Sequence, residues 1–232
     1  MTGSDPERQP VNALADQVDT LVRLGYPALL GIDEARLRAV LDDLRTHVGA
    51  APDVGSAPED GSVPVVLVVT AAAVPTNEAL GHVTRRGKDA VEKLYPRQPE
   101  YFQPIRSVQV PRAHAYLAFG IERGDAYLNV TPDDAMVSIT ERGRTPLTID
   151  EGVALLTHYP EFIQRNRCFS LLGSRGDDRR VPALWLSDGH PKLGWCWAGN
   201  PHTWLGSASC ATRSVGVRFD EPVPGDRAPP AG

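Results

Sequence analysis

The sequence predicts an α+β fold: an N-terminal helical hairpin, a mixed and mostly antiparallel sheet with helices, and a β-rich C-terminal third. Two observations carry this prediction. Segments with helical periodicity gather before residue 50 and between residues 131 and 157, whereas strand-like segments follow one another from Cys168 onward. Strands and helices do not alternate regularly, as they would in a doubly wound parallel sheet, so we expect them to segregate.

Composition limits the class of protein. The chain has 232 residues, enough for one large domain, and a net charge of −5 without a basic stripe, so we expect no nucleic-acid partner. The longest apolar run, residues 63–74, is interrupted by Pro64 and Thr70. It is shorter than the roughly 20 apolar residues of a spanning helix, so we expect no membrane partner. The N-terminus lacks the apolar segment of a signal peptide, and three cysteines suit reduced thiols, so we expect a cytoplasmic protein.

The N-terminal helices follow from apolar spacing and local breakers. Residues 11–24 carry valines and leucines at helical spacing, and Gly25 followed by Pro27 predicts the end of that helix. Asp33 is a good N-cap for a second helix, which Gly49 ends. These two helices form the predicted hairpin, residues 11–48.

Composition also suggests the domain boundaries. Residues 1–10 and 220–232 are predicted to be flexible ends, and residues 49–62, rich in Gly, Ala, Pro and Ser, a linker or a long loop. Residues 63–219 then form the main α+β domain. We favour a long surface loop within one domain, because two helices alone bury too little surface to be stable.

The first half of the main domain is predicted from β-branched runs and turn residues. Residues 63–69 form a strand buried on both faces, with Pro64 at its start. The other expectations are a short helix at 88–94, strands at 105–110 and 113–121, and a turn at 122–125 leading into a strand at 126–130.

The second half begins with two clear helix starts. Thr131 caps a helix that has Pro132 at its first position, and residues 148–151 (Thr-Ile-Asp-Glu) form a capping box. A short helical turn is expected at 161–166. The predicted strands that follow are residues 168–173, 181–187, 192–198, 204–212 and 214–219.

Residues 181–212 form the most unusual segment. They contain all four tryptophans, two of the three cysteines and two of the six histidines, yet only Asp188 and Lys192 are charged. Such a segment is either a dense small core or a ligand site. If residues 192–199 form a strand, alternation places Trp195 and Trp197 on one face with Leu193.

The predicted ligand-binding residues of this segment are Trp195, Trp197, Asn200, Trp204 and Ser207. The tryptophans would face the small-residue segment 206–210 and line a slot for a flat ligand or a sugar. The alternative is that these tryptophans are only core.

Two loops carry the predicted catalytic residues. Asp188 and His190 lie in residues 187–191, and His202 lies with Asn200 in residues 199–203. If both loops meet at one end of the sheet, these side chains could perform general acid–base chemistry. The alternatives are structural, because Asp-Gly is a common hairpin turn and a loop histidine can bind the backbone.

No metal site is predicted, and the sequence leaves any cofactor unknown. Cys168, Cys196, His202 and Cys210 lack the closely spaced ligand pairs of structural zinc sites, and Cys196 between two tryptophans fits an inert buried thiol better than a nucleophile. The arginines at 85–86 and 175–180 lack a phosphate-loop pattern and are interpreted as solvated charge.

Three stretches carry a family resemblance: residues 24–27 (Leu-Gly-Tyr-Pro), residues 145–152 and residues 192–210. Together they resemble a family of soluble actinobacterial proteins that is catalogued as a domain of unknown function. The resemblance implies a cytoplasmic bacterial protein and brings no activity, cofactor or catalytic residue.

Two functional hypotheses therefore remain open. The first is a small-molecule-binding protein, or an enzyme, with a Trp- and His-lined site in the β-rich region. The second is a non-catalytic interaction or scaffold protein whose Trp-rich sheet is core. In the second case a partner, or another copy in a homo-oligomer, would meet a surface formed by Leu14, Leu21, Leu37 and Leu44.

Overall fold

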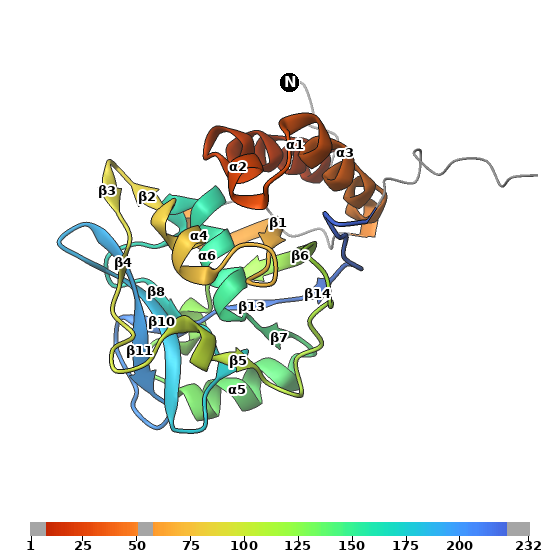
Figure 1. The fold of residues 1–232 in the computed structure, drawn as a ribbon. Helices are drawn as coiled ribbons and strands as arrows, with labels where there is room; N and C mark the ends of the chain where they lie inside the picture. The colour runs from red at the N-terminus through yellow and green to blue at the C-terminus, as the bar shows by residue number, and fades with distance from the viewer. Residues whose placement is uncertain (1–7, 51–57, 222–232) are drawn as a thin grey trace, which may run out of the picture.

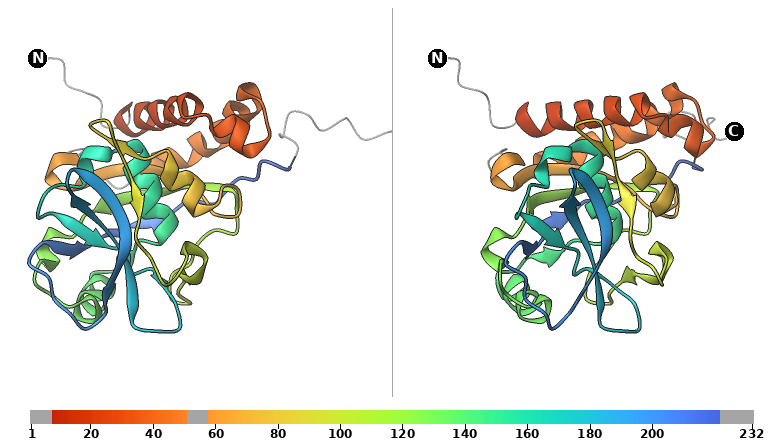
Figure 2. Two further views of the ribbon diagram at one scale, coloured as in Figure 1. Left: turned by 60° about the vertical axis from the view of Figure 1, so that its left-hand side comes forward. Right: turned by 90° about the vertical axis from the view of Figure 1, so that its left-hand side faces the viewer.

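The computed structural model describes residues 8–50 and 58–221. Two five-stranded sheets and their helices form the body of the molecule, and the N-terminal helices lie together along one side (Figure 1). Both views of Figure 2 keep these helices at the end of the molecule opposite α5 (Pro132–Glu141). The fold is α+β, as the sequence predicts.

The N-terminal helical region is divided differently from the two predicted helices, at residues 11–24 and from Asp33. Its helices are α1 (Arg8–Arg23), α2 (Tyr26–Leu30), α3 (Glu34–Asp42) and a 3₁₀ helix at Asp43–Ala50. Gly25 ends α1 with a left-handed φ of 83°. Pro27 does not break the helical region, because it lies in the first turn of α2, where its missing N–H is not needed. Asp33 caps α3, accepting from the backbone N–H of Arg36 at 2.7 Å.

The first sheet joins strands from distant parts of the chain. Its strands are β1 (Ser62–Val69), β6 (Ala115–Glu122), β13 (Ser209–Cys210), β7 (Thr145–Pro146) and β14 (Thr212–Arg213). The order is β1-β6-β13-β7, with β14 also paired to β6, and β1 runs antiparallel to β6. Residues 63–69 are buried, as their β-branched composition predicts.

The second sheet carries the Trp-rich segment. Its strands are β12 (Leu205–Ser207), β8 (Cys168–Ser170), β10 (Arg180–Ser187), β11 (His190–Trp197) and β4 (Val91–Glu92), in the order β12-β8-β10-β11-β4. β10 and β11 form an antiparallel hairpin. Because only β11–β4 and β12–β8 are parallel, this sheet is mixed.

The remaining elements are short apart from two helices with the predicted caps. These elements are α4 (Thr76–Gly81), α6 (Ile149–His158), the strand pairs β2 (Thr84–Arg85) with β3 (Lys88–Asp89) and β5 (Gln103–Pro104) with β9 (Ser174–Arg175), and 3₁₀ turns at Pro58–Asp60, Pro99–Tyr101, Asp125–Tyr127 and Pro160–Phe162. Thr131 caps α5, and Thr148 with Glu151 forms the capping box of α6. α6 packs against β1 and α4 near the middle of the molecule (Figure 1).

Several predicted elements are wrong, each for a tertiary reason. Residues 88–94 form β3 and β4 rather than a helix, because a turn with positive φ at Arg86 and Gly87 pairs β3 with β2, and β4 joins the edge of β11. Residues 105–110 contain a turn instead of the predicted strand, and residues 126–130 continue a 3₁₀ turn instead of forming a strand. Residues 204–212 are split among three short strands, and residues 214–219 contribute only an isolated bridge at Val217.

The outer edge of β1 is closed by side chains. The Gln17 amide donates to the Val65 carbonyl at 3.0 Å and accepts from the Leu67 N–H at 2.6 Å. This is the pattern that a residue of a parallel neighbouring strand would make. His158 Nε2 bonds the Leu67 carbonyl at 2.9 Å. An edge strand that would otherwise offer unpaired backbone groups is thereby closed, and α1 is fixed in place.

The N-terminal helices and the sheets share one hydrophobic cluster. Leu14, Leu21, Leu37 and Leu44 are between 0 and 1% exposed. They pack within this chain, so the expected partner surface on these leucines is not available. The predicted flexible ends and linker fall largely on residues 1–7, 51–57 and 222–232, outside the described residues.

Candidate functional site

The most distinctive surface lies at one end of the β10–β11 hairpin. Arg180 pairs directly across from Trp197, so their side chains share a face with Trp195. The two indole rings meet edge to face at 5.1 Å, and the Arg180 guanidinium lies 4.5 Å from the Trp195 ring centre and 5.0 Å from that of Trp197. Strand alternation therefore builds a cation–π stack from three side chains.

The backbone of Tyr95 lies beside this stack. The Trp195 indole N–H donates to the Tyr95 carbonyl at 3.2 Å. The Tyr95 side chain is 84% exposed, and Trp197 is 41% exposed. We refer to Tyr95, Arg180, Trp195 and Trp197 as the aromatic platform. Large aromatic side chains left at the surface in a group are typical of binding faces rather than of core.

Charged groups surround the platform. Asp178 accepts from the backbone N–H of Arg180 at 2.8 Å and also binds its guanidinium, while Arg97 lies 3.5 Å away. Arg97 in turn stacks on the Tyr101 ring at 4.3 Å. Desolvation by burial would raise the pKa of Asp178, but the hydrogen bonds from Arg180 lower it. The platform is thus flanked by an ionised carboxylate, Asp178, and one further arginine, Arg97.

The opposite face of the hairpin carries Trp185, a partly buried side chain. Trp185 packs over Gly194, and a Cβ added to Gly194 would lie 2.3 Å from the Trp185 ring. Cys196, on that same face, is buried against Ser170, with Sγ and Oγ 3.5 Å apart. The four tryptophans therefore do not form one wall, since Trp185 lies on the opposite face of the hairpin from Trp195 and Trp197.

The structure does not bring the predicted polar residues together. Asp188 and Asn200 lie beyond opposite ends of β11, which over eight residues separates them by about 25 Å. His202 precedes β12, and β8 and β10 lie between β12 and β11. The two loops do not meet at one end of the sheet because the Asp-Gly turn makes β10–β11 a simple hairpin, leaving its turn and its open end apart.

Each of these loop residues makes a structural contact. His190 Nδ1 bonds the Asp89 carbonyl at 2.8 Å, and Lys88 donates to the Asp188 carbonyl, so the turn is tied to β3. The His202 carbonyl accepts from the Asn129 N–H at 2.8 Å. Its ring packs against Trp204 at 5.3 Å.

Trp204 and Ser207 lie at the other edge of the sheet from the platform. Trp204 immediately precedes β12, and Ser207 is buried within it. β12 pairs with β8 and β13 with β6 and β7, so the small-residue segment does not lie beside β11. Of the predicted ligand-binding residues, only Trp195 and Trp197 belong to the platform.

The three cysteines are buried and separate. Burial raises the pKa of Cys168 and of Cys196, and it raises the pKa of Cys210 to about 11. A buried thiol with a raised pKa is a poor nucleophile at neutral pH. Within residues 8–50 and 58–221, no group of three or more His, Cys, Asp or Glu side chains is placed to hold a metal ion.

One buried ion pair escaped the sequence analysis. Glu151 accepts from Arg213 at 2.6 and 2.9 Å, from the Tyr116 hydroxyl at 2.8 Å and from the Thr148 N–H at 2.7 Å. Burial alone would raise the pKa of Glu151, but the charge and hydrogen bonds of Arg213 lower it. The capping-box motif identifies Glu151, whereas nothing in the sequence links it to Arg213, 62 residues away.

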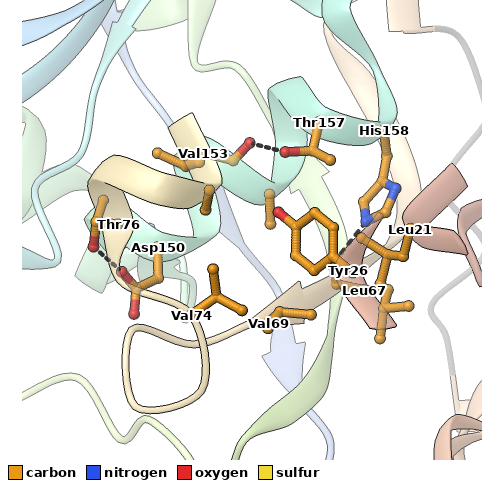
Figure 3. A pocket seen from close by; sticks show the side chains of 12 residues that line it. Leu21, Tyr26, Leu67, Val69, Val74, Thr76, Asp150, Val153, Thr157 and His158 are labelled. Carbon is orange, nitrogen blue, oxygen red and sulfur yellow. Dashed lines mark hydrogen bonds between the residues drawn. The ribbon is translucent and has the colours of Figure 1, made fainter. Parts of the chain in front are cut away.

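A small cavity under α2 is a second feature without a sequence motif (Figure 3). Its volume is about 10 Å³, about that of one water molecule. Thr76 and the Ala71 N–H donate to Asp150 at 3.0 and 2.9 Å, and burial raises the pKa of this carboxyl. Burial also lowers the pKa of His158, at the other end of the cavity, to about 4. The cavity is too small for an organic ligand.

Comparison with known proteins identifies the family without a function. Residues 20–216 match the model of a family of unknown function, DUF5701. The chain belongs to this family. The DUF5701 match covers α2 to β14 and so includes the platform and the cavity. No curated protein and no solved structure matches the chain. Among the described residues, no helix is long and apolar enough to cross a membrane.

Proposed function

We propose that this DUF5701 protein binds a small ligand on the aromatic platform, and that the ligand is a saccharide or a similarly flat molecule with a polar rim. The observation that carries the proposal is the exposure of Trp197 and Tyr95 beside an indole stacked on Arg180. A core reading of the Trp-rich sheet does not account for these two exposed rings.

The chemistry of the platform suits such a ligand. Covering an aromatic ring with an apolar C–H face is favourable, because it removes apolar surface from water, and sugars present such faces. Hydroxyl groups at the rim of a sugar need planar donors and acceptors, which Asp178 and Arg97 offer beside the rings. Arg180, held between Asp178 and the indoles, keeps the stack in one geometry before the ligand arrives.

We favour binding over catalysis. The predicted acid–base residues Asp188, His190 and His202 are distributed over different parts of the sheet, and none belongs to the platform. The proposal retains the expectations of an actinobacterial, cytoplasmic protein without a nucleic-acid partner, and it leaves room for a homo-oligomer.

Tryptophan fluorescence provides the test. Titration with a panel of neutral mono- and oligosaccharides should give a saturable change that Trp197→Ala weakens by about tenfold or more, equivalent to about 1.4 kcal/mol. Val215→Ala is the matched control, because Val215 is an exposed apolar residue outside the platform. If no saccharide changes the emission, or if both variants bind as the parent does, the proposed function is wrong.

A further inference from the structure

Two segments that are distant in the sequence are joined beside the aromatic platform. Tyr101 joins them, because its hydroxyl donates to the carboxylate of Asp177 and accepts from the Asp177 N–H at 3.1 Å. Gly176 lies so close to the Tyr101 ring that an added Cβ would overlap it. The segment that carries Tyr95 is thereby fixed to the segment that leads into β10.

Arg97 is held at this junction. Its Cζ lies 4.3 Å from the centre of the Tyr101 ring, and its backbone N–H donates to the Leu94 carbonyl at 3.0 Å. Tyr95, whose carbonyl accepts from the Trp195 indole, is two residues earlier, so its Cα is at most about 7.6 Å from that of Arg97. A guanidinium of restricted orientation therefore lies at the rim of the platform.

The outer edge of this guanidinium is available to a ligand. The Arg97 side chain is 39% exposed although its Nε is buried, so the exposed part of the group is the edge formed by Nη1 and Nη2. Nη2 is 3.5 Å from the Asp178 carboxylate, longer than the usual range of about 2.7–3.2 Å, and Nη1 has no hydrogen-bond partner among the described residues. Asp178 is instead bonded to both the backbone N–H and the guanidinium of Arg180.

The geometry of this edge favours a carboxylate over other acceptors. Arg97, Arg180, Asp177 and Asp178 together carry no net charge, so we expect selection by hydrogen bonds at contact rather than by a strong field. The two parallel N–H donors of a guanidinium edge match the two oxygens of a carboxylate. Hydrogen bonds to such a charged acceptor are roughly twice as strong as those to a neutral one.

We propose that the saccharide bound by the platform carries a carboxylate, as uronic acids do, and that Arg97 is the residue that selects it. This inference rests on the proposed function, in which a sugar ring lies on the exposed aromatic side chains. The carboxylate at the rim of that sugar accepts from Nη1 and Nη2 of Arg97. A neutral sugar of the same shape still stacks on the rings but binds more weakly.

The experiment uses the full chain and two matched probes, trigalacturonate and its trimethyl ester, titrated at neutral pH and followed by tryptophan fluorescence. The probes have the same sugar rings and differ in the charge of their carboxyl groups. We expect the acid to bind about tenfold more tightly than the ester. Arg97→Gln should abolish this preference by weakening the acid about tenfold, while the affinity for the ester stays within about twofold.

Two variants serve as controls. Arg106→Gln removes the same charge at an exposed arginine outside the platform, and it should keep the preference for the acid. Trp197→Ala should weaken both probes alike, because it removes an exposed ring on which either sugar stacks.

The two proposals can fail separately. If the parent binds acid and ester equally, or if Arg97→Gln and Arg106→Gln behave alike, the inference is overturned and the proposed function stands. If neither probe binds, or if Trp197→Ala leaves both affinities unchanged, the platform is not the site and both proposals are wrong.

Discussion

Acidification should destabilise this protein through His158 in particular. The residue is partly buried at the end of α6, where Nδ1 is buried and Nε2 bonds the Leu67 carbonyl of β1. Burial is the cause that lowers the pKa of His158, from 6.5 to about 4, against the opposing hydrogen bond to Leu67. Tyr26 and Asp150 line the small cavity with it, and Asp16 and Tyr159 line a surface hollow with it.

The sign and size follow from linkage. Because the folded-state pKa lies below the unfolded value, the unfolded chain binds the proton first as pH falls. The contribution is fully present above about pH 6.5 and is lost progressively toward pH 4. A difference of 6.5 − 4, about 2.5 units, at roughly 1.4 kcal/mol per unit corresponds to about 3 kcal/mol.

Urea denaturation between pH 7 and pH 4 measures this contribution. The free energy of unfolding of the parent should fall more steeply with acid than that of His158→Gln, which keeps a donor for Leu67 and cannot titrate. Carboxylates that titrate in the same window affect both proteins equally and cancel in the difference. His47→Gln, in the 3₁₀ segment after α3, is the matched control and should follow the parent. Parallel losses in the parent and in His158→Gln would refute the reasoning.

Three further predictions concern stability. Gln17→Met should lower the free energy of unfolding by about 2–4 kcal/mol and increase aggregation, because two backbone groups on the β1 edge lose their hydrogen-bond partners. Thr20→Ala on the same helix should lower it little, and equal denaturation midpoints for the two variants would contradict this. Gly194→Ala should lower the free energy of unfolding by about 1–3 kcal/mol, because the added methyl group clashes with the Trp185 ring. It should also change the near-ultraviolet circular dichroism, and an unchanged spectrum would argue against the packing of Trp185 on Gly194. Glu151→Gln should lower the free energy of unfolding by about 3–5 kcal/mol, because it leaves Arg213 buried without its counter-charge. The double variant with Arg213→Met should recover part of this loss. A double variant less stable than Glu151→Gln would show that the ion pair is not the cause.

The features that the sequence determined are local ones. Asp33, Thr131 and Thr148 cap their helices through backbone N–H groups three residues away. Each cap can therefore be predicted from four consecutive residues. The Asp188–Gly189 turn has positive φ at both residues, which fixes the β10–β11 hairpin and its register. Once that register is set, strand alternation places Trp195 and Trp197 on one face, as expected from the sequence.

Contacts between distant segments decided the rest. The sequence cannot show that β4 joins β11 or that Arg213 reaches Glu151, because these pairings depend on which surfaces remain after the core has packed. For the same reason periodicity left open whether the tryptophans are core or surface. The structure buries Leu193 in the middle of β11 and leaves Trp197, on the same face at the end of the strand, exposed. It also separates His202 from Asp188, because β8 and β10 fill the space between their strands, whereas His158, an ordinary residue at the end of a helix in the sequence, becomes a buried acceptor only when α1 packs over β1.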